Sequence, residues 1–113
     1  LQGLAVRVAD REALQRGGLG SEYHYESLAG RRKVKTMEPF VVHPPRDFPD
    51  ATAVFPHPGE EFLLVLKGAI EVHVGERQFR LETGDSVYFD SELPHRMRTV
   101  SRAMAEVLVV AAH

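Results

Sequence analysis

Two histidines and one glutamate are the residues of this sequence with the clearest potential for chemistry. His57 precedes Pro58-Gly59, Glu61 follows it by four residues, and His95 comes much later, directly after Pro94. Two imidazoles and one carboxylate can form a facial triad, which leaves coordination positions open for water, substrate or dioxygen. The sequence therefore predicts a divalent metal site that suits Fe(II), with Mn, Ni or Zn as other candidates.

The alternation of side chains along the strands indicates that these residues face one interior surface. Glu61 shares a strand face with Leu63 and Val65, where a carboxylate is costly unless it is paired or binds a cation. His95 shares a face with Met97, whereas the arginines of the same strand have the opposite parity and should face water. The alternative is that the carboxylate simply pairs with the two imidazoles, without any metal.

Five further residues are candidates for contact with a small molecule. Tyr23 and Tyr25 would share a strand face and could hydrogen-bond a ligand, although alternating tyrosines on a half-buried strand are also explained by packing. The apolar lining would come from the strand faces that carry the triad, namely Leu63, Val65 and Met97. The sequence thus predicts an interior pocket with the triad at its polar end.

Short stretches of alternating apolar and polar residues must position these side chains. Six strands are expected in the second half of the chain, over residues 61–66, 70–74, 78–82, 87–89, 95–100 and 104–110. The first of them is apolar on both faces, so we expect it to be buried on both sides. Short strands separated by frequent turns are typical of an all-β sandwich or barrel.

The first half of the chain is less regular. Alternation predicts a strand over residues 4–8, and residues 11–16 could form one helical turn. Further strands are expected at 23–25 and 33–43. Five prolines within residues 44–58 predict a loop or an edge strand there.

Length and composition fit one folded domain. The 113 residues are 43% apolar, which is enough for a core, and we expect an N-terminal strand or arm over about 1–20 and a barrel over 21–113. The start at Leu1 reads like the middle of a protein, so we expect the domain to have been cut from a longer chain.

Composition also excludes several classes of function. The 14 Lys and Arg against 16 Asp and Glu leave no basic excess for nucleic acid, so any DNA contact would need another domain. The absence of Cys excludes disulfides and thiolate metal sites and is compatible with the cytoplasm. The longest apolar run, 62–66, is far shorter than the roughly 20 residues that cross a membrane. No Gly-rich phosphate loop is present, so no nucleotide cofactor is expected.

Two segments of the chain resemble the paired motifs of the cupin superfamily. His57-Pro-Gly-Glu-Glu-Phe-Leu-Leu-Val-Leu-Lys-Gly68 is similar to the first cupin motif, and Gly84-Asp-Ser-Val-Tyr-Phe-Asp-Ser-Glu-Leu-Pro-His95 is similar to the second. The resemblance implies a cupin double-stranded β-helix, a jelly-roll barrel with its ligands lining one end. Cupins also commonly form dimers, and an isolated jelly roll has sheet edges to protect, so we expect a homodimer in which strand 4–8 is a candidate for pairing.

Two positions depart from the cupin pattern. Phe55 stands where the first motif usually has a further histidine, and Thr99 stands where the second usually ends in asparagine. The resemblance then implies either a true three-ligand triad or a barrel that has lost its metal and holds an organic ligand.

Two narrower resemblances correspond to these two possibilities. The two motif segments are similar to those of the C-terminal cupin domains of bacterial helix-turn-helix regulators, in which the cupin is a sensor. The His-x3-Glu…His pattern and the Tyr-x-Tyr pair are similar to the hydroxypropylphosphonate epoxidase family, whose catalytic Lys comes from a preceding helical domain. Our leading hypothesis is an effector-sensing domain that binds a small molecule, with DNA contacted only by an absent N-terminal domain. The alternative is a mononuclear non-haem metal enzyme of the oxygenase or epoxidase type.

Overall fold

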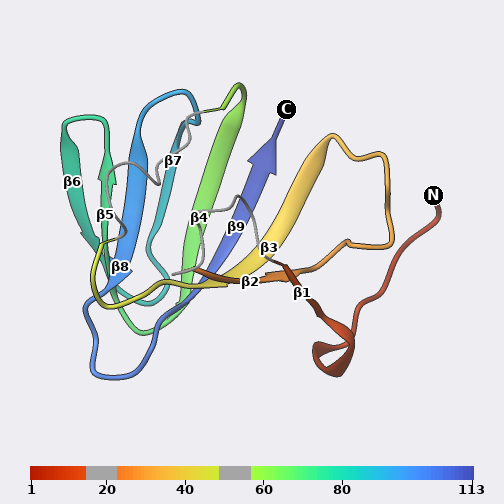
Figure 1. Ribbon diagram of the computed structural model, residues 1–113, viewed down its shortest axis with the longest axis horizontal. Helices are drawn as coiled ribbons and strands as arrows, with labels where there is room; N and C mark the ends of the chain where they lie inside the picture. Colours follow the sequence, from red (N-terminus) through yellow and green to blue (C-terminus); the bar gives the residue numbers. More distant parts are fainter. Residues whose placement is uncertain (15–22, 49–56) are drawn as a thin grey trace.

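The computed structural model describes residues 1–14, 23–48 and 57–113, and almost all of its regular structure is β (Figure 1). One sheet has the strand order β1-β2-β3-β9-β4-β7, and the other has the order β6-β5-β8. The strands are β1 Glu12–Leu14, β2 His24–Ser27, β3 Met37–His43, β4 Glu60–Lys67, β5 Ile70–Val74, β6 Arg77–Leu81, β7 Ser86–Asp90, β8 His95–Thr99 and β9 Glu106–Ala112.

The strand order is that of a jelly roll. The strand β4 lies between β7 and β9, which come later in the chain, and every strand pair is antiparallel. Crossed antiparallel pairing of this kind builds double-sheet jelly rolls. The all-β class and the six strands predicted for the second half of the chain, β4 to β9, are confirmed.

The core lies between the two sheets, because each strand turns alternate side chains toward the other sheet. The buried cluster takes Leu63 and Val65 from β4, Val107 from β9, and Ile70 and Val72 from β5. This packing fixes β4 of the larger sheet against β5 and β8 of the smaller one. The polar end of the site is built on these strands.

The prediction that β4 is buried on both faces is wrong. Leu63 and Val65 are buried, but Phe62 and Leu64 on the other face are only half-buried, and Leu66 is 45% exposed. The physical reason is that only one face of the larger sheet meets the three-stranded sheet. Apolar composition on both faces therefore does not guarantee a neighbour on both faces.

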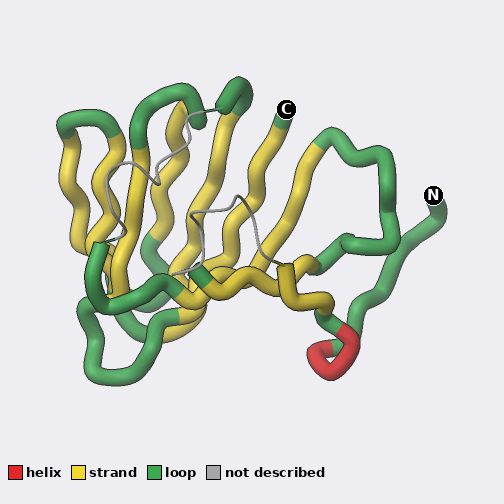
Figure 2. The backbone as a smooth tube through the Cα atoms, in the orientation of Figure 1, coloured by secondary structure: helices red, strands yellow, loops and turns green. Residues whose placement is uncertain are grey.

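The N-terminal predictions are also wrong. Residues 4–7 form no strand, and Val8–Asp10 form a 3-10 helix (Figure 2). The helical turn expected at 11–16 is replaced, in its described part, by the strand Glu12–Leu14, which pairs with β2. A single helical turn fixes several residues for few hydrogen bonds, whereas pairing with a strand already in the sheet satisfies the backbone more fully.

The strands before the site begin later than the sequence suggested. The strand expected at 23–25 is found as His24–Ser27, and the one expected at 33–43 is found as Met37–His43. The described part of the proline-rich stretch, 44–48 and 57–58, contains no helix or strand. Among the residues that the structure describes, no helix has the length and apolar character needed to span a bilayer.

Candidate metal centre

Two strands from different sheets and one loop bring the three chemical side chains together. Glu61 is the second residue of β4, His95 is the first residue of β8, and His57 lies in the loop before β4. The Glu61 Oε2 atom lies 3.2 Å from His57 Nε2 and 3.0 Å from His95 Nε2. One ligand atom from each residue lies within 4.8 Å of the others. The three residues are thus arranged as the sequence spacing anticipated.

A glycine corner delivers His57 to the site. Gly59 has φ +111°, and a Cβ built there would lie 1.9 Å from the carbonyl oxygen of Ala112, so only glycine fits this approach of the loop to β9. Ser91 holds the same corner through its main chain. The N–H of His57 donates to the Ser91 carbonyl at 3.1 Å, and the N–H of Ser91 donates to the Gly59 carbonyl at 2.9 Å.

Main-chain carbonyls fix the tautomers of both histidines. His95 Nδ1 lies 2.7 Å from the Leu93 carbonyl, and His57 Nδ1 lies 3.3 Å from the Pro58 carbonyl. Because a carbonyl oxygen only accepts, each Nδ1 must carry the hydrogen. In the neutral imidazole this leaves a lone pair on Nε2, the atom of each ring that faces the carboxylate.

Burial and contact act in opposite directions on the charges of this cluster. The side chains of Glu61 and His95 are only 10% and 19% exposed. Burial alone would raise the pKa of Glu61, but contact with His95 and the charges of both histidines lower it below its ordinary value of 4.5. Burial alone would lower the pKa of His95, but contact with Glu61 and the Leu93 carbonyl raises it above 6.5. The pair therefore favours a positive imidazolium beside a carboxylate when no other cation is bound.

The donor set fits a divalent metal ion. Glu61 Oε2 is buried and, despite the two short contacts, has no hydrogen-bond partner with good geometry. Two nitrogen lone pairs and an anionic oxygen that converge at close range repel one another unless a proton or a cation lies among them. Two imidazoles and one carboxylate suit Fe, Mn, Ni or Zn and leave further coordination positions open.

The residues expected to contact a ligand belong to the core that surrounds the triad. The Tyr23 hydroxyl donates to the Met97 carbonyl and accepts from the Met97 N–H, both at 3.0 Å. The Tyr25 ring lies 5.9 Å from that of Tyr23 and 6.0 Å from that of Phe40. The remaining three are buried in the core cluster, namely Leu63, Val65 and Met97. These contacts fit the packing role, and a role in ligand binding is a proposal.

The two positions that depart from the cupin pattern do not extend the donor set in the described structure. The Thr99 hydroxyl is buried and fully used, because it donates to the Pro44 carbonyl at 2.7 Å and accepts from the Ala105 N–H at 3.2 Å. It therefore ties a loop to β8. Phe55 lies outside the described residues.

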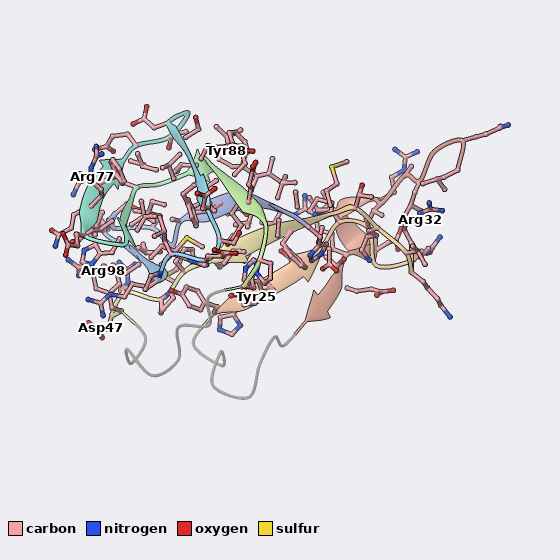
Figure 3. The ribbon with its side chains drawn as sticks, turned by 90° about the horizontal axis from the view of Figure 1, so that it is seen from above. Tyr25, Arg32, Asp47, Arg77, Tyr88 and Arg98 are labelled. Atoms are coloured by element: carbon pink, nitrogen blue, oxygen red, sulfur yellow. The ribbon has the colours of Figure 1, made fainter. Side chains whose placement is uncertain are left out.

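The arginines of β8 lie on the side opposite to the triad, as their parity predicts. Arg98 Nη2 lies 2.8 Å from Glu71 Oε1, and the guanidinium carbon of Arg96 lies 4.3 Å from the Phe48 ring centroid. Figure 3 shows Arg98 near the end of the molecule that carries the smaller sheet, apart from Tyr25 near the middle. These two cations therefore belong to the outer surface.

The outer surface also holds a histidine whose surroundings the sequence did not reveal. His73 is half-buried, lies with its Nε2 2.8 Å from Glu71 Oε2 and packs with its ring centroid 4.4 Å from that of Phe48. The prediction missed Phe48, because contact between a loop and a sheet leaves no spacing signal. Ser91 was missed for the same reason, although it lies within the second cupin-like motif.

Comparisons with known proteins agree with this architecture. The cupin domain family model matches residues 41–111. The (S)-2-hydroxypropylphosphonic acid epoxidase of Streptomyces wedmorensis is 29% identical over 100 residues, which cover 82% of this chain and 50% of that protein. The chain thus spans about half the length of this curated relative.

Solved structures show the same fold. Fe(II)-HppE with the alternative substrate (S)-1-HPP matches with a TM-score of 0.72 at 22% identity, over 99% of this chain and 60% of that one. The Cnp3 cupin domain of Schizosaccharomyces pombe matches with a TM-score of 0.72 at 15% identity, over 96% and 73% of the two chains. At these identities the structural matches establish the fold alone. Because the family model covers more than half of the sequence, the chain belongs to the cupin domain family.

Proposed function

We propose that this cupin domain binds a divalent metal ion through His57, Glu61 and His95, and a small molecule at the open coordination positions. The observation that carries the proposal is the convergence of two imidazole nitrogens and one buried carboxylate oxygen within 4.8 Å, with the Nδ1 atom of each ring against a main-chain carbonyl. The similarity to an epoxidase, and to a solved structure named for Fe(II), favours iron among the candidate metals. Bound metal would supply Lewis-acid polarisation of the small molecule.

The protein's own residues prepare the site for that role. The Leu93 and Pro58 carbonyls hold the two imidazoles in the tautomer that a metal needs. Glu61 supplies the negative charge, and its burial strengthens attraction to a cation because few water molecules screen it. The five residues Tyr23, Tyr25, Leu63, Val65 and Met97 would form the lining nearest to this polar end.

The first candidate for a more specific function is an effector-sensing domain of a helix-turn-helix regulator in the cytoplasm. In that protein another part of the chain would bind DNA. The triad joins β4 of the larger sheet to β8 of the smaller sheet, so ligand binding there can bias the position of one sheet against the other. Arg96 and Arg98 are held on the outer surface, which leaves them unsuited to anchor an anionic substrate inside. A sensor needs binding and a shifted equilibrium, and no further chemistry.

The second candidate for a more specific function is a mononuclear non-haem metal enzyme. The specific observation in its favour is the 29% identity to the epoxidase, together with a triad that leaves open positions. Because the chain spans about half of that relative, the activity of the whole protein is a proposal in its own right.

Metal loading followed by oxygen measurement tests these functions in sequence. Purified protein is loaded with Fe(II) without oxygen, and its metal content and heat stability are measured with a panel of small carboxylates and phosphonates. We expect metal uptake and protection by at least one compound that grows with its concentration, without oxygen-dependent turnover. Oxygen uptake that is coupled to consumption of a compound and lost in Glu61→Ala would establish the enzyme instead. Absence of metal uptake by folded protein would refute the centre itself.

A further inference from the structure

Ser91 lies where the main-chain support of one triad residue meets the side chain of another. It follows β7, in the turn that leads to β8, and its exposed fraction is 0%. Its carbonyl accepts from the N–H of His57 and its N–H donates to the Gly59 carbonyl, so its main chain holds the corner that presents the His57 ring. Its side chain, in contrast, lies beside Glu61.

The Ser91 hydroxyl and the Glu61 carboxylate are neighbours without a fully formed hydrogen bond. Glu61 of β4 lies opposite Phe89 of β7, and Ser91 continues that register two residues further on the same face, where its N–H bonds to the Gly59 carbonyl. Ser91 is therefore a diagonal neighbour of Glu61. Contact with the Ser91 side chain is one of the causes that lower the pKa of Glu61. Yet Ser91 Oγ and Glu61 Oε2 are both buried atoms for which the described structure gives no well-aligned partner. Buried polar groups without hydrogen-bond partners are unfavourable and uncommon. An arrangement in which both the hydroxyl and the carboxylate oxygen have a partner is therefore favoured.

We propose that Ser91 is a positioning residue for the metal centre, which holds His57 through its main chain and orients the Glu61 carboxylate through its hydroxyl. This inference rests on the proposed metal-binding function. A hydroxyl that donates to one carboxylate oxygen leaves the other oxygen free for a metal and fixes the plane of the carboxylate. In this arrangement the metal would be the partner of Glu61 Oε2, and the other carboxylate oxygen would be the partner of the Ser91 hydroxyl, so neither atom would be left without one.

A purely structural Ser91 would behave differently. If the residue only fills space and caps the turn, loss of its hydroxyl would change stability and leave the metal environment as it was. A positioning role places the change in the affinity for metal and in the electronic spectrum of the bound ion. Loss of an outer-shell partner of a ligand typically lowers metal affinity by roughly 10- to 100-fold.

The test is a titration of metal-free protein with Co(II), monitored by visible absorption, for wild type, Ser91→Ala and Ser27→Ala. Ser27 is a matched control, because it is also a buried serine, 4% exposed, whose hydroxyl accepts from the Ala29 N–H far from the triad. We expect Ser91→Ala to bind Co(II) roughly 10- to 100-fold more weakly, with a changed absorption spectrum, and Ser27→Ala to match wild type. If Ser91→Ala does not fold, Ser91→Gly is titrated in its place under the same criteria.

The outcomes separate this inference from the function on which it rests. Wild-type affinity and spectrum in folded Ser91→Ala would overturn the positioning role and leave the metal centre standing. Failure of folded wild type to bind Co(II) would overturn the proposed function instead. An equal loss of affinity in Ser27→Ala would show a general effect of destabilisation and would also overturn the role of Ser91.

Discussion

Main-chain carbonyls hold both imidazoles of the triad in the Nδ1–H tautomer, which is the one that can bind a metal through Nε2. Each Nδ1 lies against a carbonyl oxygen within two residues of its own ring, so in the neutral imidazole the lone pair is on Nε2, the atom that lies 3.2 Å (His57) or 3.0 Å (His95) from Glu61 Oε2. A metal ion bound as proposed would meet histidines already in the ligand tautomer, which would lower the cost of reorganisation on binding.

Replacement of a ligand should affect metal protection, whereas replacement of an outer histidine should not. We expect Co(II) to raise the melting temperature of wild type by roughly 10 °C, since a Co(II) concentration a hundredfold above the Kd adds about 2.7 kcal/mol of stability. His57→Ala should lose most of that increment. His73→Ala is the matched control, because its ring pairs with Glu71 on the outer surface. Differential scanning calorimetry with and without Co(II) measures both; equal increments in the two variants would contradict the assignment.

The charges of Glu61 and His95 predict how the stability of metal-free protein depends on pH. The lowered pKa of Glu61 contributes stability that is present above its ordinary 4.5 and is lost as pH falls through the folded value. The raised pKa of His95 contributes stability that is present below its ordinary 6.5 and is lost as pH rises through the folded value.

We therefore expect the stability advantage of wild type over Glu61→Gln to be greatest between pH 4.5 and 6.5. Urea unfolding of both proteins at a series of pH values, with chelator present, gives this difference directly. An advantage that keeps growing above neutral pH would show that the imidazolium–carboxylate pair is not its source. The affinity for metal should instead rise with pH, because the metal must displace the proton on His95.

The residues of the triad were predictable because their spacing carries the geometry. A histidine, a Pro-Gly corner and a glutamate four residues on must lie close together wherever the corner turns into a strand. Strand parity then places His95 inside by requiring its arginine neighbours outside. Ser91 was not predictable, because its importance arises from contacts with His57, Gly59 and Glu61 that exist only after the chain has folded.

At the scale of the element, the corner before β4 is the feature that sets the distance between two ligands. A side chain at Gly59 would meet the Ala112 carbonyl at 1.9 Å and would hold a strained φ of +111°. Gly84 has a similar φ of +91°, but a Cβ there would meet nothing within 4 Å. Substitution of Gly84 therefore introduces backbone strain alone, whereas substitution of Gly59 introduces both backbone strain and a steric clash.

We expect Gly84→Ala to cost about 1–3 kcal/mol of stability through its backbone conformation and to keep its Co(II) affinity. Gly59→Ala should be more destabilised and should also bind Co(II) more weakly, because the loop must move away from β9 and carry His57 with it. Urea unfolding and Co(II) titration of the two variants make the comparison. Similar losses in both measurements would contradict the role assigned to the corner.

The elements that sequence reasoning placed correctly are those whose pattern and turns agree. The strands β5 and β6 alternate between apolar and polar residues and are bounded by turns that contain Gly68, Gly75 and Gly84, and this alternation also decides which face is buried. The stretch 4–8 alternates as well, but in the described structure it has no strand partner and Val8 is 73% exposed. Alternation shows that a segment can pair, and the partner is decided by the rest of the fold.

At the scale of the whole molecule, the open sheet edges predict assembly. Among the strands that the structure describes, the larger sheet ends at β1 and β7, and the smaller one ends at β6 and β8. Edge strands favour pairing with another chain, so we expect a homodimer. Residues 4–7 form no strand, so they do not supply the pairing edge that their alternation predicts. Light scattering at several protein concentrations tests the expected homodimer. A constant monomer mass at the highest concentration would refute the dimer.

The central claim is that His57, Glu61 and His95 hold one metal ion between the two sheets. Crystals grown with Co(II) test it most directly, through an anomalous difference map recorded at the cobalt absorption edge. The account predicts one strong peak per chain, about 2.1 Å from His57 Nε2, His95 Nε2 and a carboxylate oxygen of Glu61. Well-ordered density for these three side chains with no peak among them, or a peak at another site alone, would contradict it.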